Sequence, residues 1–440
     1  MNNKKWMAIL LGGIMAASLA APCSVSAAEK TTLTFWHAMG GTNGEVLQQI
    51  VDDFNASQDE IEVKAEYQGT YDDTITKLKA AMQSDSGLPD VCQMYDVGTK
   101  FMYDSGAVIP VEDKFESTGY DKSSVMDVIS SYYTVDGKQY AMPFNVSTPM
   151  LYYNKDVFEA AGLDPETPPT TYDEVLEDAK KIVESGAAPV GYSQAIYGWF
   201  FEQQLAGLGV TYGNNDNGRT EAVTAVDFDS NGGGLKVFDM WKKLYDSGYF
   251  EDYGTTTADT QTAFFSGQVG MIIESTAILK NAVDSSPFEV GTGYLPRIEQ
   301  NDEGGVIIGG GSLWLTDTGN EANEDAAWKF IEYITTPDVQ AKWSMGTGYF
   351  AINEKAYETD DMKAYLEENP NFETAINQLK DSPVNCNTAG VLSGVQTEAR
   401  LTFNEIMPQV YDGKLTTQDA VDQLAASVNK AIENYNESIK

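Results

Sequence analysis

Basic residues and histidine are scarce in this chain of 440 residues, and each shortage excludes a class of function. Only 28 residues are Lys or Arg, against 66 Asp and Glu, which gives a formal net charge of −38 at pH 7. Nucleic acids and anionic lipid surfaces bind proteins through basic patches, so we expect neither as a partner. The single histidine, His37, provides no cluster of metal ligands and no base for a serine hydrolase. We therefore expect no metal, although a calcium site made of carboxylates, without EF-hand spacing, stays open as an alternative. We predict that His37 packs or forms a hydrogen bond at the end of a strand.

Long hydrophobic runs are missing from everything after the N-terminus. Lys4 and Lys5 precede an apolar stretch at 8–21 that is too short to span a bilayer, and small residues at 25–28 form a cleavage site. This pattern predicts a signal peptide over 1–28 and an exported protein, either periplasmic or extracellular. No later segment offers ~20 continuous apolar residues, so the mature chain is not expected to span a membrane.

Cysteine is rare as well, and its three positions leave two questions open. Cys23 is a competing site for lipid attachment, although Pro22 directly before it fits such a site poorly. Cleavage after residue 28 leaves Cys92 and Cys386, which suffice for one disulfide. The sequence does not show whether the two pair.

The first segment after the predicted signal peptide alternates strand and helix patterns. Strand patterns at 32–35, 61–67 and 90–95 flank helical apolar spacings at 46–54 and 75–82. This βαβαβ order is typical of a mostly parallel sheet with helices on both faces. Ligands bind such sheets beyond the carboxyl ends of the strands. The residues expected at that edge are Trp36 and His37, 67–71, and Tyr95 and Asp96.

A second α/β unit follows, and its clearest signal is a helix start. Thr171 and Glu174 form a capping box, in which a hydroxyl and a carboxylate satisfy free backbone amides. A strand pattern at 150–153 precedes it, and an amphipathic helical pattern over 421–435 ends the chain. Because no low-complexity linker separates the units, two lobes sharing several crossings fit the sequence better than separate domains.

The motifs provide no complete catalytic set. The glycine run at 309–311 lacks the Lys-Ser/Thr of a phosphate loop and the spacing of a dinucleotide fingerprint, so no cofactor is expected. Asp96 is the acid that stands out, because it follows an apolar strand at the edge where ligands bind. Capping a turn or a helix is its alternative role. A glycosidase would need a second defined carboxylate, which the sequence does not single out.

Four motifs occur in order along the mature chain and carry a family resemblance. They are TLTFWHAMGG at 32–41, FNVSTPMLYYNKDVFEAAGLDPETPPTTYDEV at 144–175, IIGGGSLWLT at 307–316 and GTGYFAINEKAY at 346–357. The set resembles the extracellular solute-binding proteins of ABC importers for sugars and related polyols, over essentially the whole mature chain. The motifs are more specific in this shared order than any one of them alone.

The resemblance implies an α/β, two-lobed periplasmic-binding-protein-like fold. Each lobe is then a mostly parallel sheet flanked by helices, and a multi-strand hinge joins the lobes. The implied division gives lobe 1 as 29–146 with 312–357, and lobe 2 as 147–311 with 358–440. Crossings between the lobes are expected at 143–148, near 308–312 and near Tyr357.

Within this family the closest likeness is to the members that bind glycerol-3-phosphate. Their ligand-contacting positions correspond one at a time to residues of this chain. The implied ligand-binding set is Tyr71, Asp96, Ser147, Trp199, Ser275, Gly310, Tyr349 and Arg400. Two positions depart from the family pattern, because Asp96 stands in place of a glutamate and Ile196 in place of a second tryptophan.

The chemistry of this set suits a polyol phosphate. Tyrosine and serine hydroxyls match polyol hydroxyl groups, and Asp96 can accept two neighbouring hydroxyl protons. Arg400 offers a planar fork to phosphate oxygens, and Gly310 lets a backbone amide approach a ligand closely. We therefore expect a monomeric binding protein, not an enzyme, that captures glycerol-3-phosphate or a glycerophosphodiester in a cleft. Hinge closure and delivery to the transmembrane permease subunits of an ABC importer follow from the resemblance.

Three alternatives stay open at this stage. The same clamp could hold a neutral mono- or oligosaccharide, since sugar rings stack on the abundant aromatic side chains. An exported glycosidase would use Asp96 with a second acid, and a surface adhesion protein would have no small ligand. Arg400 itself has an alternative role as a structural ion pair.

Overall fold

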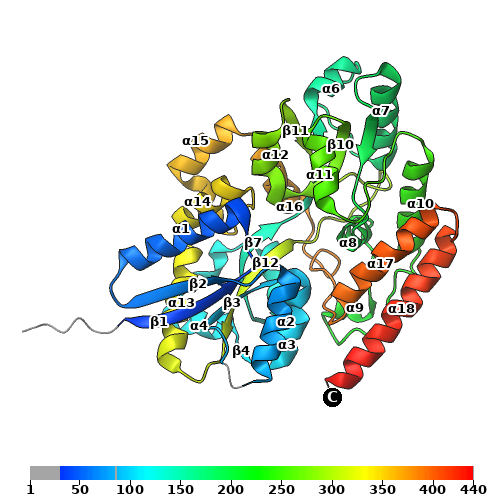
Figure 1. Ribbon diagram of the computed structural model, residues 1–440. Helices are drawn as coiled ribbons and strands as arrows, with labels where there is room; N and C mark the ends of the chain where they lie inside the picture. The colour runs from blue at the N-terminus through cyan, green and yellow to red at the C-terminus, as the bar shows by residue number, and fades with distance from the viewer. Residues whose placement is uncertain (1–29, 85–86, 440) are drawn as a thin grey trace, which may run out of the picture.

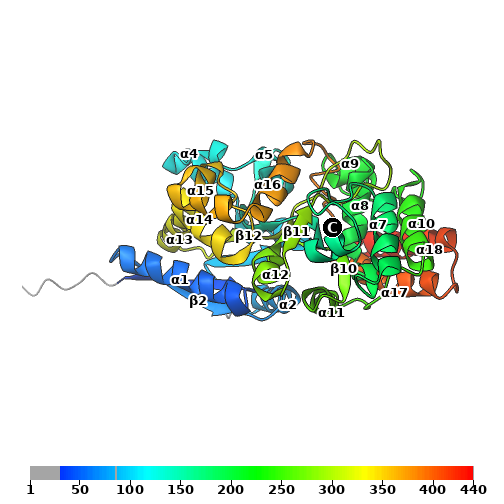
Figure 2. The same cartoon turned by 90° about the horizontal axis from the view of Figure 1, so that it is seen from above.

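The computed structural model describes residues 30–84 and 87–439. The predicted signal peptide and the lipid-attachment alternative at Cys23 lie outside the described residues. Two sheets, each covered by helices, form two lobes that lie side by side along the long axis of the molecule (Figures 1 and 2). We define lobe 1 by the six-stranded sheet and lobe 2 by the four-stranded sheet. The expected two-lobed α/β fold is confirmed.

The sheet of lobe 1 has the order β2-β1-β3-β12-β4, with β7 also paired to β12. Its strands are β1 (Thr31–His37), β2 (Ile61–Tyr67), β3 (Val91–Tyr95), β4 (Val108–Ile109), β7 (Met142–Ser147) and β12 (Gly309–Thr316). β1 runs parallel to β2 and β3, whereas β12 runs antiparallel to all three of its neighbours. A single reversed strand thus enters an otherwise parallel sheet.

Helices cover lobe 1 because their apolar residues repeat at helical spacing. α1 (Gly41–Ser57) buries Leu47, Ile50, Val51 and Phe54 and packs on β2, as the sequence predicts. The other helices of this lobe are α2 (Tyr71–Met82), α3 (Thr99–Ser105), α4 (Val111–Thr118), α5 (Asp127–Ser130), α13 (Glu321–Ile334), α14 (Pro337–Thr347) and α15 (Asp360–Glu368). Short 3₁₀ turns lie at η1 (Asp96–Gly98), η2 (Lys122–Ser124), η3 (Ser131–Tyr133) and η5 (Glu354–Glu358), and a small hairpin pairs β5 (Thr134–Val135) with β6 (Lys138–Gln139).

The sheet of lobe 2 has the order β11-β8-β10-β9. Its strands are β8 (Pro149–Asn154), β9 (Val190–Ser193), β10 (Val269–Ser275) and β11 (Val290–Gly293). β8 is antiparallel to both of its neighbours, and β9 is parallel to β10. The carboxyl ends of β9, β10 and β11 therefore lie at the same edge of the sheet, which is the edge where β8 begins.

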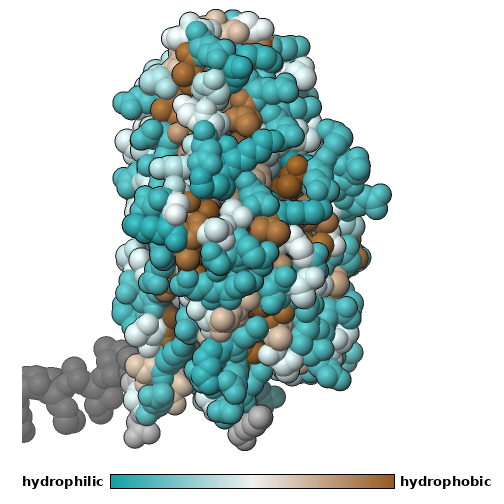
Figure 3. All heavy atoms as spheres, turned by 90° about the vertical axis from the view of Figure 1, so that its right-hand side faces the viewer, coloured by the Kyte–Doolittle hydropathy of each residue, from teal (hydrophilic) through white to brown (hydrophobic). Residues whose placement is uncertain are grey.

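The helices of lobe 2 include the predicted capped helix. In α7 (Tyr172–Ser185) the Thr171 side chain accepts from the Glu174 amide, and the Glu174 side chain accepts from the Thr171 amide, so the capping box is confirmed. The other helices are α6 (Lys155–Ala160), α8 (Gly198–Gly207), α9 (Asn214–Gly218), α10 (Gly233–Asp246), α11 (Thr257–Phe265), α12 (Leu279–Ser285), α16 (Asn371–Asp381), α17 (Gln396–Tyr411) and α18 (Thr417–Ser438), with the 3₁₀ turn η4 (Thr276–Ile278). The side of lobe 2 around α10 and α18 shows hydrophobic side chains only in small separate groups (Figure 3).

Three segments of the described chain connect the lobes. β7 of lobe 1 leads directly into β8 of lobe 2, and the segment before β12 returns to lobe 1. The third crossing lies in the turn between α15 and α16, later in the chain than the expected position near Tyr357, because α15 packs on α14 of lobe 1. The first crossing is fixed by Thr148, whose carbonyl accepts from the amide of Thr276 at 2.9 Å. An apolar cluster continues from lobe 1 into the β8–β10 face of lobe 2, including Met150 and Ile272.

The described residues contain no helix that is long and apolar enough to cross a bilayer. Within the same part of the chain, no group of His, Cys, Asp and Glu side chains is arranged to hold a metal ion. Cys92 is buried and Cys386 is partly buried, and both are free thiols rather than a disulfide.

Candidate ligand-binding site between the lobes

A buried ion pair joins the two lobes at the predicted cleft. Asp96 begins η1 directly after β3 in lobe 1, and Arg400 lies in the first turns of α17 in lobe 2. The Nη2 atom of Arg400 donates to Oδ2 of Asp96 at 2.7 Å, and the two side chains are only 7% and 6% exposed. The sequence places Asp96 here because a buried strand ends at this edge of the sheet. Two of the predicted site residues are thus in direct contact.

Glu202 is a third member of this charged group, and sequence reasoning missed it. Its two carboxylate oxygens accept from Nε and Nη2 of Arg400 at 2.8 and 2.7 Å, and Nε2 of Gln396 donates to the same carboxylate at 2.9 Å. Glu202 lies in α8, in which every residue from 198 to 206 is buried. The sequence signal that could have identified Glu202 is its position as a lone acid next to the aromatic residues of WFFEQQ, because a buried charge needs a partner.

Burial and charge act on this group in opposite directions. Burial disfavours a charged Arg400, but the carboxylates of Asp96 and Glu202 raise the pKa of the guanidinium well above its usual value. Burial raises the pKa of Glu202, although Arg400 and Gln396 act to lower it. Because both oxygens of Glu202 accept hydrogen bonds, the geometry fits the ionised form. The structure therefore shows Arg400 in the ion-paired role that the sequence left as an alternative, and its role toward a ligand stays a prediction.

Tyr71 begins α2 in lobe 1 and belongs to a hydrogen-bond network. Its hydroxyl accepts from Nδ2 of Asn145 at 2.8 Å, and Oδ1 of Asn145 accepts from Gln93 at 2.7 Å. The ring of Tyr71 stacks on Tyr95, with centroids 5.1 Å apart and planes 7° apart. Burial raises the pKa of Tyr71 well above its usual value, so the hydroxyl stays protonated and can donate to a ligand. Asn145 and Gln93 were not predicted.

Gly310 lies beside this network, where β12 passes Asn145. Its φ of 87° is in the left-handed region, and a Cβ at this position would overlap the carbonyl oxygen of Asn145. At Gly311 a Cβ would lie 2.8 Å from Oδ1 of Asn145 and 3.4 Å from the hydroxyl of Tyr71. The glycine run therefore allows β12 to approach the network around Tyr71 closely.

Trp199 lies at the beginning of α8, on the lobe 2 side. Its Nε1 atom is buried and has no hydrogen-bond partner among the described residues. A Cβ at Gly309 would lie 2.7 Å from the Trp199 ring, and a Cβ at Gly198 would lie 2.5 Å from Cα of Arg400. Trp199 is thus next to β12, and the residue before it packs against the backbone of Arg400. An indole N–H that is buried without an acceptor is a candidate donor to a bound solute.

The remaining predicted residues lie around the crossings. Ser147 ends β7, is buried, and is paired with Gly309 in the sheet. Ser275 ends β10, where its hydroxyl caps η4 by accepting from the amide of Ala277 at 3.2 Å. Tyr349 is buried and stacks on Trp343 at 5.6 Å.

Tyr349 lies near residues of both lobes. Its neighbour Gly348 is so close to lobe 2 that a Cβ there would lie 2.9 Å from the carbonyl oxygen of Thr276. Burial has the larger effect in raising the pKa of Tyr71, and the nearby Tyr349 raises this pKa further. The predicted residues thus occupy both lobes and the crossings between them. No hydrogen bond among the described residues joins Ser275 to the other seven.

Further contacts between the lobes lie outside the predicted set. The hydroxyls of Tyr95 and Thr397 lie 2.6 Å apart, and Tyr435 of α18 donates to Asp104 of α3 at 2.6 Å. Arg219 donates to the carbonyl oxygen of Tyr132 in lobe 1 at 2.9 Å. The described structure is therefore a closed form, with the lobes in contact.

His37 has a structural role, as the sequence predicts. The side chain is buried, and its Nδ1 atom accepts from the amide of Met39 at 3.3 Å. Burial lowers the pKa of His37 to about 4, so the imidazole is neutral at physiological pH.

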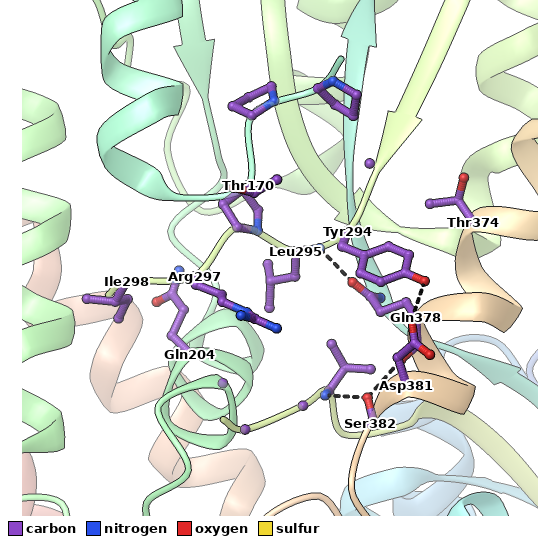
Figure 4. Close-up of a pocket in the computed structure, with 18 of the residues that line it drawn as sticks. Thr170, Gln204, Tyr294, Leu295, Arg297, Ile298, Thr374, Gln378, Asp381 and Ser382 are labelled. Carbon is purple, nitrogen blue, oxygen red and sulfur yellow. Dashed lines mark hydrogen bonds between the residues drawn. The ribbon is translucent and has the colours of Figure 1, made fainter. Parts of the chain in front are cut away.

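A separate pocket of about 530 Å³ lies in lobe 2. Its walls come from the segments 168–170 and 292–306, from the end of α8, and from α16 (Figure 4). The guanidinium of Arg297 points into it, and Tyr294 donates to Asp381 at 2.8 Å on the opposite side. None of the eight predicted ligand residues lines this pocket. Because the walls contain no residue of the lobe 1 sheet, a solute bound here would not bridge the lobes.

Comparison with known proteins assigns the family. Residues 49–374 match the family described as bacterial extracellular solute-binding protein. The chain belongs to this family of solute-binding proteins. This solute-binding protein is 31% identical over 417 residues to the sn-glycerol-3-phosphate-binding periplasmic protein UgpB of Escherichia coli strain K12, covering 93% of this chain and 94% of that one.

Solved structures agree on the fold of this solute-binding protein. UgpB from Mycobacterium tuberculosis in complex with glycerophosphocholine has a TM-score of 0.79 at 20% identity, covering 93% of this chain and 100% of that one. The cyclic α-maltosyl-1,6-maltose binding protein from Arthrobacter globiformis has a TM-score of 0.75 at 26% identity, covering 92% and 100%. Relatives of both kinds bind solutes, so the chain is the solute-binding component of an ABC importer and not an enzyme. The glycosidase and adhesion alternatives are therefore excluded.

Proposed function

We propose that this solute-binding protein captures a small polyol phosphate, glycerol-3-phosphate or a glycerophosphodiester, between its lobes and delivers it to the permease of the importer. The observation that carries the proposal is the position of Arg400. Its guanidinium bridges the two lobes through Asp96, and its backbone lies against Gly198, the residue before Trp199, whose indole N–H has no partner in the described chain. The similarity to UgpB over most of both chains supports the same ligand class.

The closed structure suggests how a ligand would enter this arrangement. One oxygen of the Asp96 carboxylate, Oδ2, accepts from Nη2 of Arg400, a position that a phosphate oxygen could take instead. A bound phosphate would replace Asp96 on Arg400 and free the carboxylate to accept from the polyol hydroxyls. Tyr71 would offer its hydroxyl from lobe 1, and Trp199 its N–H from lobe 2. The ligand contacts both lobes only when they are closed, so binding shifts the population toward the closed form.

Isothermal titration calorimetry with sn-glycerol-3-phosphate and glycerophosphoglycerol tests the proposal. Micromolar affinity, roughly −8 kcal/mol, is expected for one of these esters. Arg400→Gln should abolish that binding, whereas the matched variant Arg297→Gln, which changes an arginine outside the cleft, should leave it intact. Circular dichroism confirms that each variant is folded. Unchanged affinity in folded Arg400→Gln would remove Arg400 from the site.

A neutral sugar is the second candidate, and the charge balance of the cleft favours it. Asp96 and Glu202 already provide two negative charges for the single positive charge of Arg400. A ligand without charge avoids the resulting repulsion, and the Arthrobacter relative binds a cyclic maltosyl-maltose. A thermal-shift screen of maltose and related sugars beside the phosphate esters separates the two candidates. Stabilisation by a sugar alone would replace the phosphate proposal.

We also propose that the protein acts as an exported monomer. The signal-peptide pattern over 1–28 supports export, with Cys23 as the competing lipid-attachment site. Intact-mass measurement of protein secreted by its native host distinguishes a chain that begins near residue 28 from a chain acylated at Cys23. Size-exclusion chromatography with light scattering tests the monomer.

A further inference from the structure

We infer that Glu202 sets the charge of the solute that the cleft accepts, so that a neutral or singly charged solute binds better than a dianionic phosphate monoester. The inference rests on the proposed position of the ligand beside Arg400. It concerns a residue that the family resemblance does not assign, and it narrows the ligand class from phosphate esters in general to those of low charge.

The hydrogen bonds of Arg400 show how much of the guanidinium is already used. Within the described residues, Glu202 engages Nε and Nη2, Asp96 engages Nη2, and no hydrogen bond engages Nη1. Glu202 therefore occupies one edge of the guanidinium with a two-point contact, which fixes the orientation of the group. A ligand is left with the other edge, at Nη1 and the position now held by Asp96.

The charges around this edge determine which ligand fits. A phosphate monoester carries about −1.5 to −2 at pH 7, whereas a phosphodiester carries a single negative charge. Neither Asp96 nor Glu202 forms a salt bridge with a lysine in the described part of the chain. The other two arginines are also used or directed elsewhere, since Arg219 donates to backbone carbonyls and Arg297 points into the lobe 2 pocket. A dianion would thus meet a buried group whose own sum is negative, in surroundings that screen charge weakly.

Burial makes the effect of Glu202 large. The side chains of Glu202 and Arg400 are 6% and 7% exposed, so solvent cannot screen the carboxylate from a ligand on the same guanidinium. Gln396 adds a third hydrogen bond to the carboxylate and holds it in place at 2.9 Å. If Glu202 only positioned Arg400, replacing it would weaken every ligand alike. If Glu202 acts through its charge, replacing it instead changes which ligand has the highest affinity.

The test compares Glu202→Gln with wild type in calorimetry at pH 7.5, using three probes of different charge. The probes are sn-glycerol-3-phosphate, glycerophosphoglycerol and maltose. Wild type is expected to bind the diester or the sugar at least about tenfold more tightly than the monoester. Glu202→Gln should gain about tenfold or more for the monoester and change less than about threefold for the sugar. Glu202→Leu serves as a second variant that removes the charge without a competing amide.

The control is Asp90→Asn, which removes a carboxylate at the opposite end of β3, where Asp90 accepts from Thr34 at 2.8 Å. Asp90→Asn should rank the three probes by affinity in the same order as wild type. Equal losses for all probes in both Glu202 variants, or no change, would overturn the inference while the proposed function stands. If wild type binds none of the probes but Glu202→Gln binds the monoester, the proposed function is overturned and the inference is supported. Absence of binding in all proteins would overturn both.

Discussion

Asp96 and Arg400 lie 304 residues apart in the sequence, and their side chains form a hydrogen-bonded ion pair 2.7 Å long between the two lobes. Neither β3 nor α17 would place a charged group in an apolar interior without such a partner. The pair therefore links the closing of the lobes to a charge balance that a ligand can change.

Removing Asp96 should open the ligand-free protein. In Asp96→Ala, Arg400 keeps Glu202 but loses its contact with lobe 1, which should weaken the closed form by about 1 to 3 kcal/mol. Small-angle X-ray scattering should then give a larger radius of gyration than wild type. Asp325→Ala removes an exposed ion pair with Lys114 inside lobe 1 and should leave the radius unchanged. Identical scattering from Asp96→Ala and wild type would show that this pair does not hold the lobes together.

Arg219 should influence ligand affinity from outside the ligand site. Its guanidinium donates to the carbonyl oxygens of Gly390 at 3.0 Å and Tyr132 at 2.9 Å, which belong to different lobes, and lies over the ring of Tyr132. Arg219→Met should reduce the population of the closed form and weaken the affinity for every solute by about the same factor, roughly fivefold to a hundredfold.

Arg297→Met is the matched control for Arg219→Met in calorimetry, because the hydrogen bonds of Arg297 in the described residues go to Thr170 and Tyr172 of lobe 2. Its affinity should equal that of wild type. If Arg219→Met lost affinity for one solute only, this would contradict the prediction that Arg219 acts only by stabilising the closed form.

Gly310 should tolerate alanine less well than another glycine with positive φ. Gly310→Ala combines a strained φ of 87° with overlap of the Asn145 carbonyl, and we expect a loss of about 3 kcal/mol or more in the free energy of unfolding. Gly319→Ala shares the positive φ, at 69°, but meets nothing within 4 Å, so about 1 kcal/mol is expected. Urea denaturation gives both values. Equal losses would show that β12 can shift away from Asn145.

His37 should make the protein less stable in mild acid. Burial lowers the pKa of His37 from 6.5 to about 4, so the unfolded chain binds a proton at a pH where the folded chain does not. The free energy of unfolding therefore falls as pH drops below 6.5, by about 1 to 2 kcal/mol at pH 5 from this group. His37→Gln should lose correspondingly less between pH 7.5 and pH 5 in urea denaturation. An equal pH dependence in both proteins would exclude His37 as the source.

Much of the fold could be predicted because apolar spacing and helix caps are local signals. The alternation around Leu33 and Phe35, the helical repeat of α1 and the Thr171 capping box all appear in the structure as the sequence predicts. The reversed direction of β8 and β12 has no local signal. It depends on pairing between segments that are far apart in the chain, and neither the sequence pattern nor the family resemblance was used to predict it.

The candidate site was harder to predict for the same reason. The residues came from the resemblance, whereas Glu202, Asn145 and Gln93 were missed because their roles depend on partners distant in sequence. Glu202 could have been noticed as an acid inside an aromatic run. Its contact with Arg400, 198 residues later, could not have been derived from spacing.

A crystal structure of the protein with the phosphate or sugar ligand that binds most tightly in calorimetry tests the central claim most directly. The claim predicts electron density for the solute between Asp96 and Arg400, with contacts to Tyr71 of lobe 1 and Trp199 of lobe 2. Density only in the lobe 2 pocket beside Arg297 and Tyr294, with the Asp96–Arg400 pair intact, would contradict it.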